Sequence, residues 1–181
     1  MKRSLNLWLL LLAFIVPVIL AWVMLSNQWY QGGVTNRGKL LDEPVQLAWL
    51  SPEQPQWQLW YFPPTPCDQS CAGALFNLRQ VPQVIGEPSQ RLASKLLVQP
   101  AVQRAEAENA LLSGMETKPI TVAEQQAWQH LPYGGAAIYV MDPHGTIMLA
   151  YPIEQEKPAI MAQGKAMVRD IKRLLKLSRI G

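Results

Sequence analysis

The chain has 181 residues, a formal net charge of +3 and a sequence pI near 9.0. The charge surplus is mild, so it gives no reason to expect a nucleic-acid-binding protein. Hydrophobic residues make up 49% of the chain, a share that one N-terminal segment inflates, and the remainder is about one domain in length. The sequence contains no evident Ser–His–Asp set, H-E-x-x-H motif or phosphate-binding loop, which argues against a hydrolase.

An apolar stretch follows the first four residues: positions 5–25 are apolar except for Asn6. This length is close to the roughly 20 residues that span a bilayer core, and Pro17 is tolerable within a membrane helix. Aromatic residues near both ends, at Trp8 and Trp22, are typical of an interfacial belt. The sequence therefore predicts a transmembrane helix over residues 5–26.

A cleaved signal peptide is the alternative interpretation of this stretch. Met24 and Leu25 occupy the place where cleavage needs small residues, so an uncleaved anchor is favoured. Lys2 and Arg3 then hold residues 1–4 in the cytoplasm, and the rest of the chain lies outside it, where paired cysteines can oxidise. The expected divisions after the anchor are a linker over residues 27–44 and an exported domain over residues 45–181.

Strand and helix patterns alternate along this exported part. Strands are expected at residues 45–50, 57–62, 92–98, 136–141 and 146–151, and helices at residues 67–81, 100–112, 121–130 and 160–177. The aromatic run over 57–62 suits an interior strand covered on both faces. Thr121 and Glu124 have the spacing of a capping box, and a turn is expected between Asp142 and Gly145. Such alternation predicts an α/β fold, a layered sheet with helices on its faces. A cysteine pair at the end of a strand and the start of a helix, followed late by a hairpin and a terminal helix, makes this the thioredoxin-like plan.

The two cysteines, Cys67 and Cys71, lie between an expected strand and the helix after it. If Cys67 opens that helix, both sulfur atoms share one helical face, and the helix dipole favours the thiolate form. Four interpretations stay open. They are thiol–disulfide exchange, Cu(I) binding by two thiolates, a structural disulfide, and an inert remnant in a protein that only docks.

With these elements placed, the chain resembles the Sco family, membrane-anchored thioredoxin-like proteins that serve cytochrome c oxidase assembly. The resemblance covers about residues 30–181. Three stretches carry it: Trp60-Tyr61-Phe62 with the following Thr65-Pro66-Cys67-Asp68-Gln69-Ser70-Cys71, the late strand that ends in Asp142-Pro143-His144-Gly145, and the closing helix with Arg169 to Leu175. The resemblance implies a bacterial inner-membrane protein whose C-terminal domain lies in the periplasm or another extracytoplasmic space.

This chain departs from the family pattern at the positions that matter for copper. The family follows each cysteine with proline, whereas this chain has Asp68 and Ala72. The family also places a histidine just before the late strand, where it joins the two cysteines as a copper ligand. The matching position here is Gly134. The resemblance therefore implies a divergent member that lacks the copper-ligand histidine.

Two histidines remain as alternative ligands. His144 lies in the turn after the late strand, which is expected on the far side of the sheet from the cysteines. His130 precedes that strand, so it is a remote candidate for a displaced ligand. The nearby Tyr133, Gly134 and Gly135 fit either a flexible strand entry or the close approach of a partner backbone. Whether Pro132 has a cis peptide bond stays open.

The last expected helix carries a run of basic residues. Such a run is usually a solvated face, although a tethered domain could lay it on anionic headgroups or an acidic partner. The members of the run are Lys165, Arg169, Lys172, Arg173, Lys176 and Arg179.

The favoured function is thiol–disulfide exchange on a copper-site partner during oxidase biogenesis. Cys67 would be the nucleophile and Cys71 the resolving thiol. The alternative is a non-catalytic protein that docks on oxidase subunits or assembly factors. A Cu(I) chaperone with Cys67 and Cys71 as metal ligands is third, and no cofactor is required for the first two.

Overall fold

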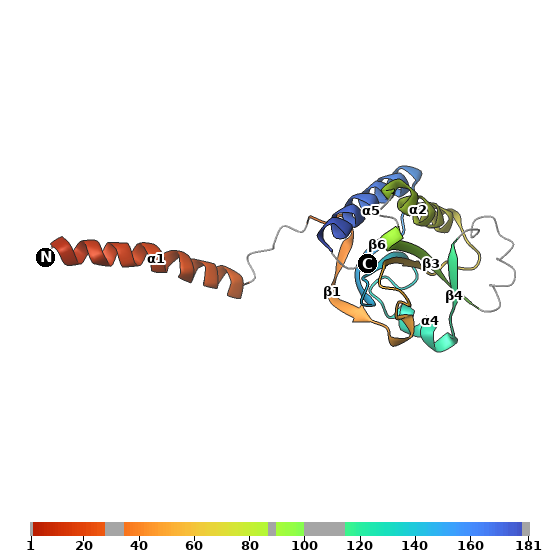
Figure 1. The fold of residues 1–181 in the computed structure, drawn as a ribbon, viewed down its shortest axis with the longest axis horizontal. Coiled ribbons are helices and arrows are strands. Elements are labelled where there is room, and N and C mark those ends of the chain that lie inside the picture. The colour runs from red at the N-terminus through yellow and green to blue at the C-terminus, as the bar shows by residue number, and fades with distance from the viewer. Residues whose placement is uncertain (1, 28–34, 87–89, 100–114, 179–181) are drawn as a thin grey trace. The chain divides into compact units, whose positions relative to one another are not determined.

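The structure is a computed structural model that describes residues 2–27, 35–86, 90–99 and 115–178 (Figure 1). It divides into two compact units, Met1–Thr35 and Asn36–Gly181. The helix expected over residues 100–112 lies outside the described residues. The two units are described separately below.

The first unit is the helix α1, Lys2–Ser26. Its stretch Trp8–Ser26 is long and apolar enough to cross a membrane, a property that anchors and signal sequences share. Large apolar side chains such as Phe14 and Trp22 are exposed along it. This surface suits a lipid environment, because apolar area in water is costly.

The second unit is built on a six-stranded mixed sheet with the order β1-β6-β5-β2-β3-β4. The strands are β1 Lys39–Gln46, β2 Trp57–Tyr61, β3 Leu92–Val98, β4 Glu116–Pro119, β5 Ala137–Met141 and β6 Thr146–Pro152. The pairs β2–β3 and β3–β4 are parallel, and the other neighbours are antiparallel. The α/β thioredoxin-like fold predicted from the sequence is confirmed.

Helices cover both faces of this sheet. On one face α2 (Gln69–Ile85) and α5 (Lys157–Leu177) lie side by side, and Leu78 and Met167 belong to a core cluster with Leu59 of β2 (Figure 1). On the other face Trp128 of α4 (Val122–Gln129) packs edge-on against Tyr139 at 5.0 Å between ring centroids. Every residue of β2 is buried, as its aromatic run predicted.

Both edge strands differ from the sequence prediction. The strand expected over residues 45–50 is wrong, since β1 runs Lys39–Gln46 and Ala48–Leu50 form a short 3-10 helix. β1 therefore begins inside the segment expected to be a linker. It is an edge strand with a register shift between Leu40 and Val45, so its polar residues show no clean alternation. The short edge strand β4 was not predicted either, because its four residues also show no alternation of buried and exposed side chains.

Helix α2 begins later and ends later than expected, at Gln69 and Ile85 instead of residues 67 and 81. It passes through Pro82, which cannot donate to the carbonyl group of Leu78 one turn earlier. The hydroxyl group of Ser94 on β3 donates to that Leu78 carbonyl oxygen at 2.7 Å. This bond from the sheet satisfies the acceptor that the proline leaves free, so the helix continues.

Three local predictions are confirmed. Thr121 and Glu124 form the expected capping box at the start of α4. The turn between β5 and β6 is closed by Gly145, whose N–H donates to the Asp142 carbonyl oxygen at 3.0 Å. The closing helix α5 buries Ile171 and Leu175 on one face. These signals are local, which is why sequence alone could locate them.

Candidate redox site

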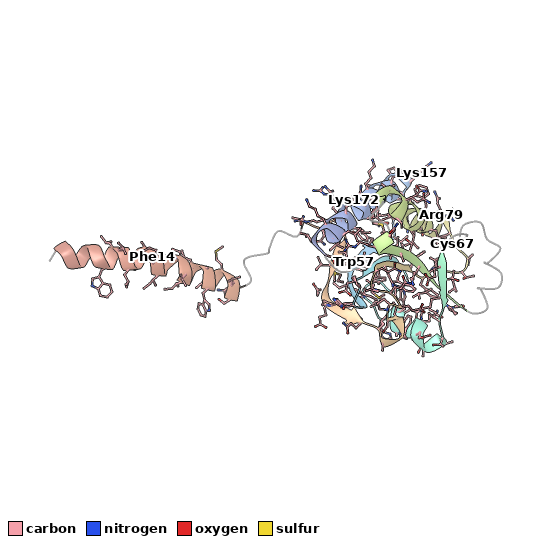
Figure 2. All side chains as sticks on the ribbon, viewed as in Figure 1. Phe14, Trp57, Cys67, Arg79, Lys157 and Lys172 are labelled. Atoms are coloured by element: carbon pink, nitrogen blue, oxygen red, sulfur yellow. A yellow bond between two sulfur atoms is a disulfide. The ribbon has the colours of Figure 1, made fainter. Side chains whose placement is uncertain are left out.

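The site lies at the carboxyl end of β2, where the chain turns into α2. Cys67 and Cys71 are joined by a disulfide bond, with 5.4 Å between their Cα atoms. Cys67 is exposed, whereas Cys71 is fully buried at 0% exposure. Figure 2 marks Cys67 at this end of the domain. An incoming thiol group can therefore reach the sulfur atom of Cys67 but not that of Cys71.

Asp68, not Cys67, caps the helix. Its carboxylate accepts hydrogen bonds from the backbone N–H of Cys71 at 2.9 Å and from the Ser70 hydroxyl group at 2.7 Å. The expectation that Cys67 opens the helix is therefore corrected, because Cys67 precedes the cap. The sequence did carry a signal for this, since aspartate is a preferred N-cap residue.

The cap also changes the electrostatics of the site. The hydrogen bond from Cys71, followed by that from Ser70, holds the pKa of the exposed Asp68 carboxyl group below its usual range. An anion thus sits on the helix N-terminus beside the disulfide and offsets the positive end of the dipole there. Burial, and then this charge, raise the pKa of the nearby Tyr61 phenol, so Tyr61 stays neutral.

A cleft of about 480 Å³ is lined in part by Thr65 and Ser70, which belong to the same turn as the cysteine pair, although neither cysteine lines it. Aromatic residues Tyr61 and Phe62 and the turn from Pro63 to Thr65 form part of its wall, and Gly135 lies at another part. Its polar lining consists largely of amide side chains, those of Gln99, Gln125 and Gln129. Sequence reasoning missed these three glutamines, because Gln99 follows β3 whereas Gln125 and Gln129 belong to α4, and they meet only when the sheet forms. The cleft can take an uncharged segment next to the turn that carries Cys67.

Gly134 has a structural reason to be glycine. Its φ angle is +50°, and an added Cβ would lie 3.3 Å from the Gln129 carbonyl oxygen. Its own carbonyl oxygen accepts a hydrogen bond from the Tyr139 hydroxyl group at 3.1 Å. The loop around it contains no cis bond at Pro132; the cis peptide bond of the described residues precedes Pro66. Replacement by histidine at this position would strain the backbone.

Neither histidine joins the cysteines. His144 lies after β5, whose register pairs Tyr139 with Trp60 and Met141 with Gln58, so the turn lies at the opposite end of β2 from Cys67. His130 ends α4, is exposed, and has its Nδ1 2.7 Å from the Gln126 carbonyl oxygen. Among the described residues, no three His, Cys, Asp or Glu side chains come together to hold a metal ion. These residues do not fit a copper site that needs an imidazole ligand.

Comparison with protein families identifies the domain. A family model described as a transmembrane-like, thioredoxin-like, C-terminal domain matches residues 57–178. The chain belongs to this family. Its thioredoxin-like domain thus includes the whole site, from β2 through the cysteines to the end of α5. A comparison with curated proteins gives no match.

Solved structures with a similar fold are Sco proteins at low sequence identity. The apo Sco1 protein from Thermus thermophilus is 19% identical with a TM-score of 0.52, over 79% of this chain and 99% of that chain. A Sco1/SenC family lipoprotein from Bacillus anthracis is 15% identical with a TM-score of 0.48, over 77% of this chain and 99% of that chain. A copper-bound ScoI from Bradyrhizobium japonicum is 18% identical with a TM-score of 0.46, over 72% and 97%. The expected resemblance to the Sco family is confirmed for the fold.

Proposed function

We propose that this protein is a membrane-anchored thiol–disulfide oxidoreductase that acts on a cysteine pair of a partner during respiratory oxidase assembly. The observation that carries the proposal is the unequal exposure of the two sulfur atoms, with Cys67 exposed and Cys71 at 0%. An exchange catalyst needs one sulfur atom that partners can reach and one that is kept from them. A purely structural bridge needs no such difference, and a loop this short stabilises a fold little.

In the reaction we propose, the reduced Cys67 thiolate attacks one sulfur atom of a partner disulfide. The partner S–S bond breaks, a mixed disulfide forms, and the leaving partner sulfur takes a proton. Cys71 loses its proton and attacks Cys67, which releases the second partner thiolate and leaves the Cys67–Cys71 disulfide. Two electrons pass from this chain to the partner, and a dithiol reductant outside the chain restores the starting state.

Copper-binding cysteines must be thiolates, so a copper site built on a cysteine pair has to be reduced before it can be loaded. This requirement links the proposed exchange to oxidase biogenesis, together with the Sco-like fold. We place the anchor in the inner membrane of a bacterium, over residues 5–26, and the domain outside the cytoplasm. The domain expected over residues 45–181 begins earlier, because β1 (Lys39–Gln46) belongs to its sheet. The apolar α1 and the Sco-like fold of the domain support this arrangement.

The alternative function is docking without chemistry, and one experiment separates the two. The full chain with Cys67→Ser and Cys71→Ser together is expressed in place of the wild-type protein, and oxidase maturation is scored by the spectrum of its metal centres. Loss of the maturation supports exchange, provided that the variant accumulates to the normal level. Normal maturation overturns exchange and leaves docking.

A further inference from the structure

The outer surface of α2 and α5 carries charge of a single sign. Apart from Asp170, which is buried, every charged residue in these two helices is a lysine or an arginine. They are Arg79, Lys157, Lys165, Arg169, Lys172, Arg173 and Lys176. Asp68 and Glu156 are the N-caps of the two helices, and Glu87 and Glu154 lie close to the helix ends in the sequence. A surface with this excess of cations favours an anionic partner.

The cations of α5 are arranged as a stripe. Lys165, Arg169, Lys172 and Lys176 recur at intervals of four, three and four residues, which places them on one side of a helix, and all four are exposed. None of them takes part in an ion pair within the described parts of the chain. Figure 2 marks Lys157 and Lys172 on α5 and Arg79 on the neighbouring α2. The charges of Lys165, Arg169, Lys172 and Lys176 are therefore available to a partner.

Apolar side chains are exposed next to this stripe. Phe76 and Val84 on α2 are 47% and 56% exposed, and Met161 on α5 is 47% exposed. They line a groove of about 270 Å³ between the two helices, and Lys165 lines the same groove. Cations around exposed apolar side chains are the combination by which a protein surface binds the boundary between lipid headgroups and acyl chains.

The chain that arrives from α1 is fastened to α5. The backbone N–H groups of Arg37 and Gly38 donate to Asp170 Oδ2 at 2.7 and 2.9 Å. Ten residues, 27–36, separate the end of α1 at Ser26 from this attachment. A chain of that length spans at most about 36 Å. If α1 is a membrane anchor, its tether holds α5 within that distance of the membrane.

We propose that the basic face, defined as Phe76, Val84, Met161, Lys165, Arg169, Lys172 and Lys176, docks on the anionic phospholipid headgroups of the membrane that holds the anchor. This inference rests on the proposed anchoring by α1, and not on the proposed redox chemistry. Docking would orient the domain and fix the height at which the Cys67 sulfur atom meets membrane-bound partners.

The test uses the full chain in nanodiscs, which leave both membrane faces open to reagents. Co-elution of the chain with the nanodiscs first reports whether α1 anchors it. Lysines are then acylated for a short time and quantified one by one by mass spectrometry, with Lys118 of β4 as the internal reference. We expect at least about threefold slower acylation of Lys165, Lys172 and Lys176, relative to Lys118, with about one third anionic phospholipid. Zwitterionic discs, or about 0.5 M salt, should abolish the difference.

A matched pair of double variants locates the surface. Lys165→Gln with Lys172→Gln should weaken docking about 25-fold, at roughly fivefold for each cation, so that Lys176 loses its protection. The control Lys39→Gln with Lys118→Gln removes the same charge elsewhere. Measured against a lysine-containing peptide added to the reaction in place of Lys118, the acylation rate of Lys176 should stay unchanged in this control. Equal acylation in anionic and zwitterionic discs, or protection that salt does not reverse, would overturn the proposal even when the chain is anchored. Protection that appears only when an acidic soluble protein is added would overturn it too.

Discussion

Asp68 decides the electrostatic character of the cysteine pair. Its carboxylate holds the first turn of α2 through the N–H of Cys71 and lies beside the disulfide. Asp68→Asn keeps a capping oxygen atom but removes the charge. We expect the variant disulfide to be reduced more readily, because the Cys67 thiolate no longer faces an anion. The equilibrium with dithiothreitol should shift towards the dithiol by up to about fivefold.

The same variant changes the acid sensitivity of folding. The pKa of the Asp68 carboxyl group is lowered in the folded protein from an ordinary value of 3.8, so its ionised form stabilises the fold above that value. This contribution is lost as the pH falls through the lowered pKa. The free energy of unfolding in urea should therefore decrease less on acidification in Asp68→Asn than in the wild type. Identical acid dependence in the two proteins would contradict the proposed role of the cap.

Asp170 is a second carboxylate that matters, this time for stability. It is 4% exposed, and its Oδ2 accepts hydrogen bonds from Arg37, Gly38 and the Tyr151 hydroxyl group at 2.9 Å. Asp170→Ala leaves these donors unsatisfied, so unfolding in urea should become easier by about 3 kcal/mol. Tyr151→Phe removes one donor and should cost about 1.5 kcal/mol. A matched control, Asp42→Ala on the exposed side of β1, should change stability by less than about 0.5 kcal/mol.

Helix α2 depends on β3 at the point where proline interrupts its hydrogen bonds. Ser94→Ala removes the bond to the Leu78 carbonyl oxygen and should destabilise the fold by about 1–2 kcal/mol. Pro82→Ala restores an N–H group that can donate to the same oxygen atom. Ser94→Ala should therefore cost clearly less in the Pro82→Ala background, as a double-mutant cycle of urea unfolding would measure. Strictly additive costs would contradict this account of the helix.

The loop between α4 and β5 requires glycine at one of two neighbouring positions. Gly134 has φ +50° and little room for a Cβ, whereas an added Cβ at Gly135 would meet Phe62 at an ordinary 3.8 Å. Gly134→Ala should cost about 1–2 kcal/mol, and Gly135→Ala should be nearly neutral, in the same unfolding measurement. Equal effects of the two substitutions would show that the backbone does not select glycine here.

These elements also mark how far sequence reasoning could go. The buried strand β2, the capping box of α4 and the apolar face of α5 depend on local patterns, and all were predicted. The bounds of β1 and the existence of β4 were not predicted, because these edge strands show little alternation of apolar and polar residues. The roles of Asp170 and of the glutamines along the cleft depend on contacts between distant segments. A lone carboxylate between Met167 and Ile171 on the buried side of a helix was the available signal for Asp170.

At the scale of the whole molecule, the parts form one proposed arrangement. In this proposal the apolar helix α1 would anchor the chain and the basic face on α2 and α5 would meet the membrane surface, while Asp170 fastens the backbone of Arg37 and Gly38 to α5. The cysteine pair lies at the carboxyl end of β2 with Cys67 exposed and Cys71 buried, and the turn that carries it lines a cleft through Thr65 and Ser70. Gly134 stands where the family pattern has its copper-ligand histidine. This chain therefore lacks the imidazole that would complete a copper site with the two cysteines.

The central claim is that the sulfur atom of Cys67 forms the mixed disulfide with partners. Trapping of that mixed disulfide tests the claim most directly. Full-chain Cys71→Ser and Cys67→Ser are produced in cells of the native host, quenched with acid and alkylated, and analysed without reductant. We predict that Cys71→Ser accumulates covalent adducts through Cys67 that a reductant releases, at least about tenfold more than Cys67→Ser, whose remaining thiol is buried. Adducts at equal levels in the two variants, or in neither, would contradict the claim.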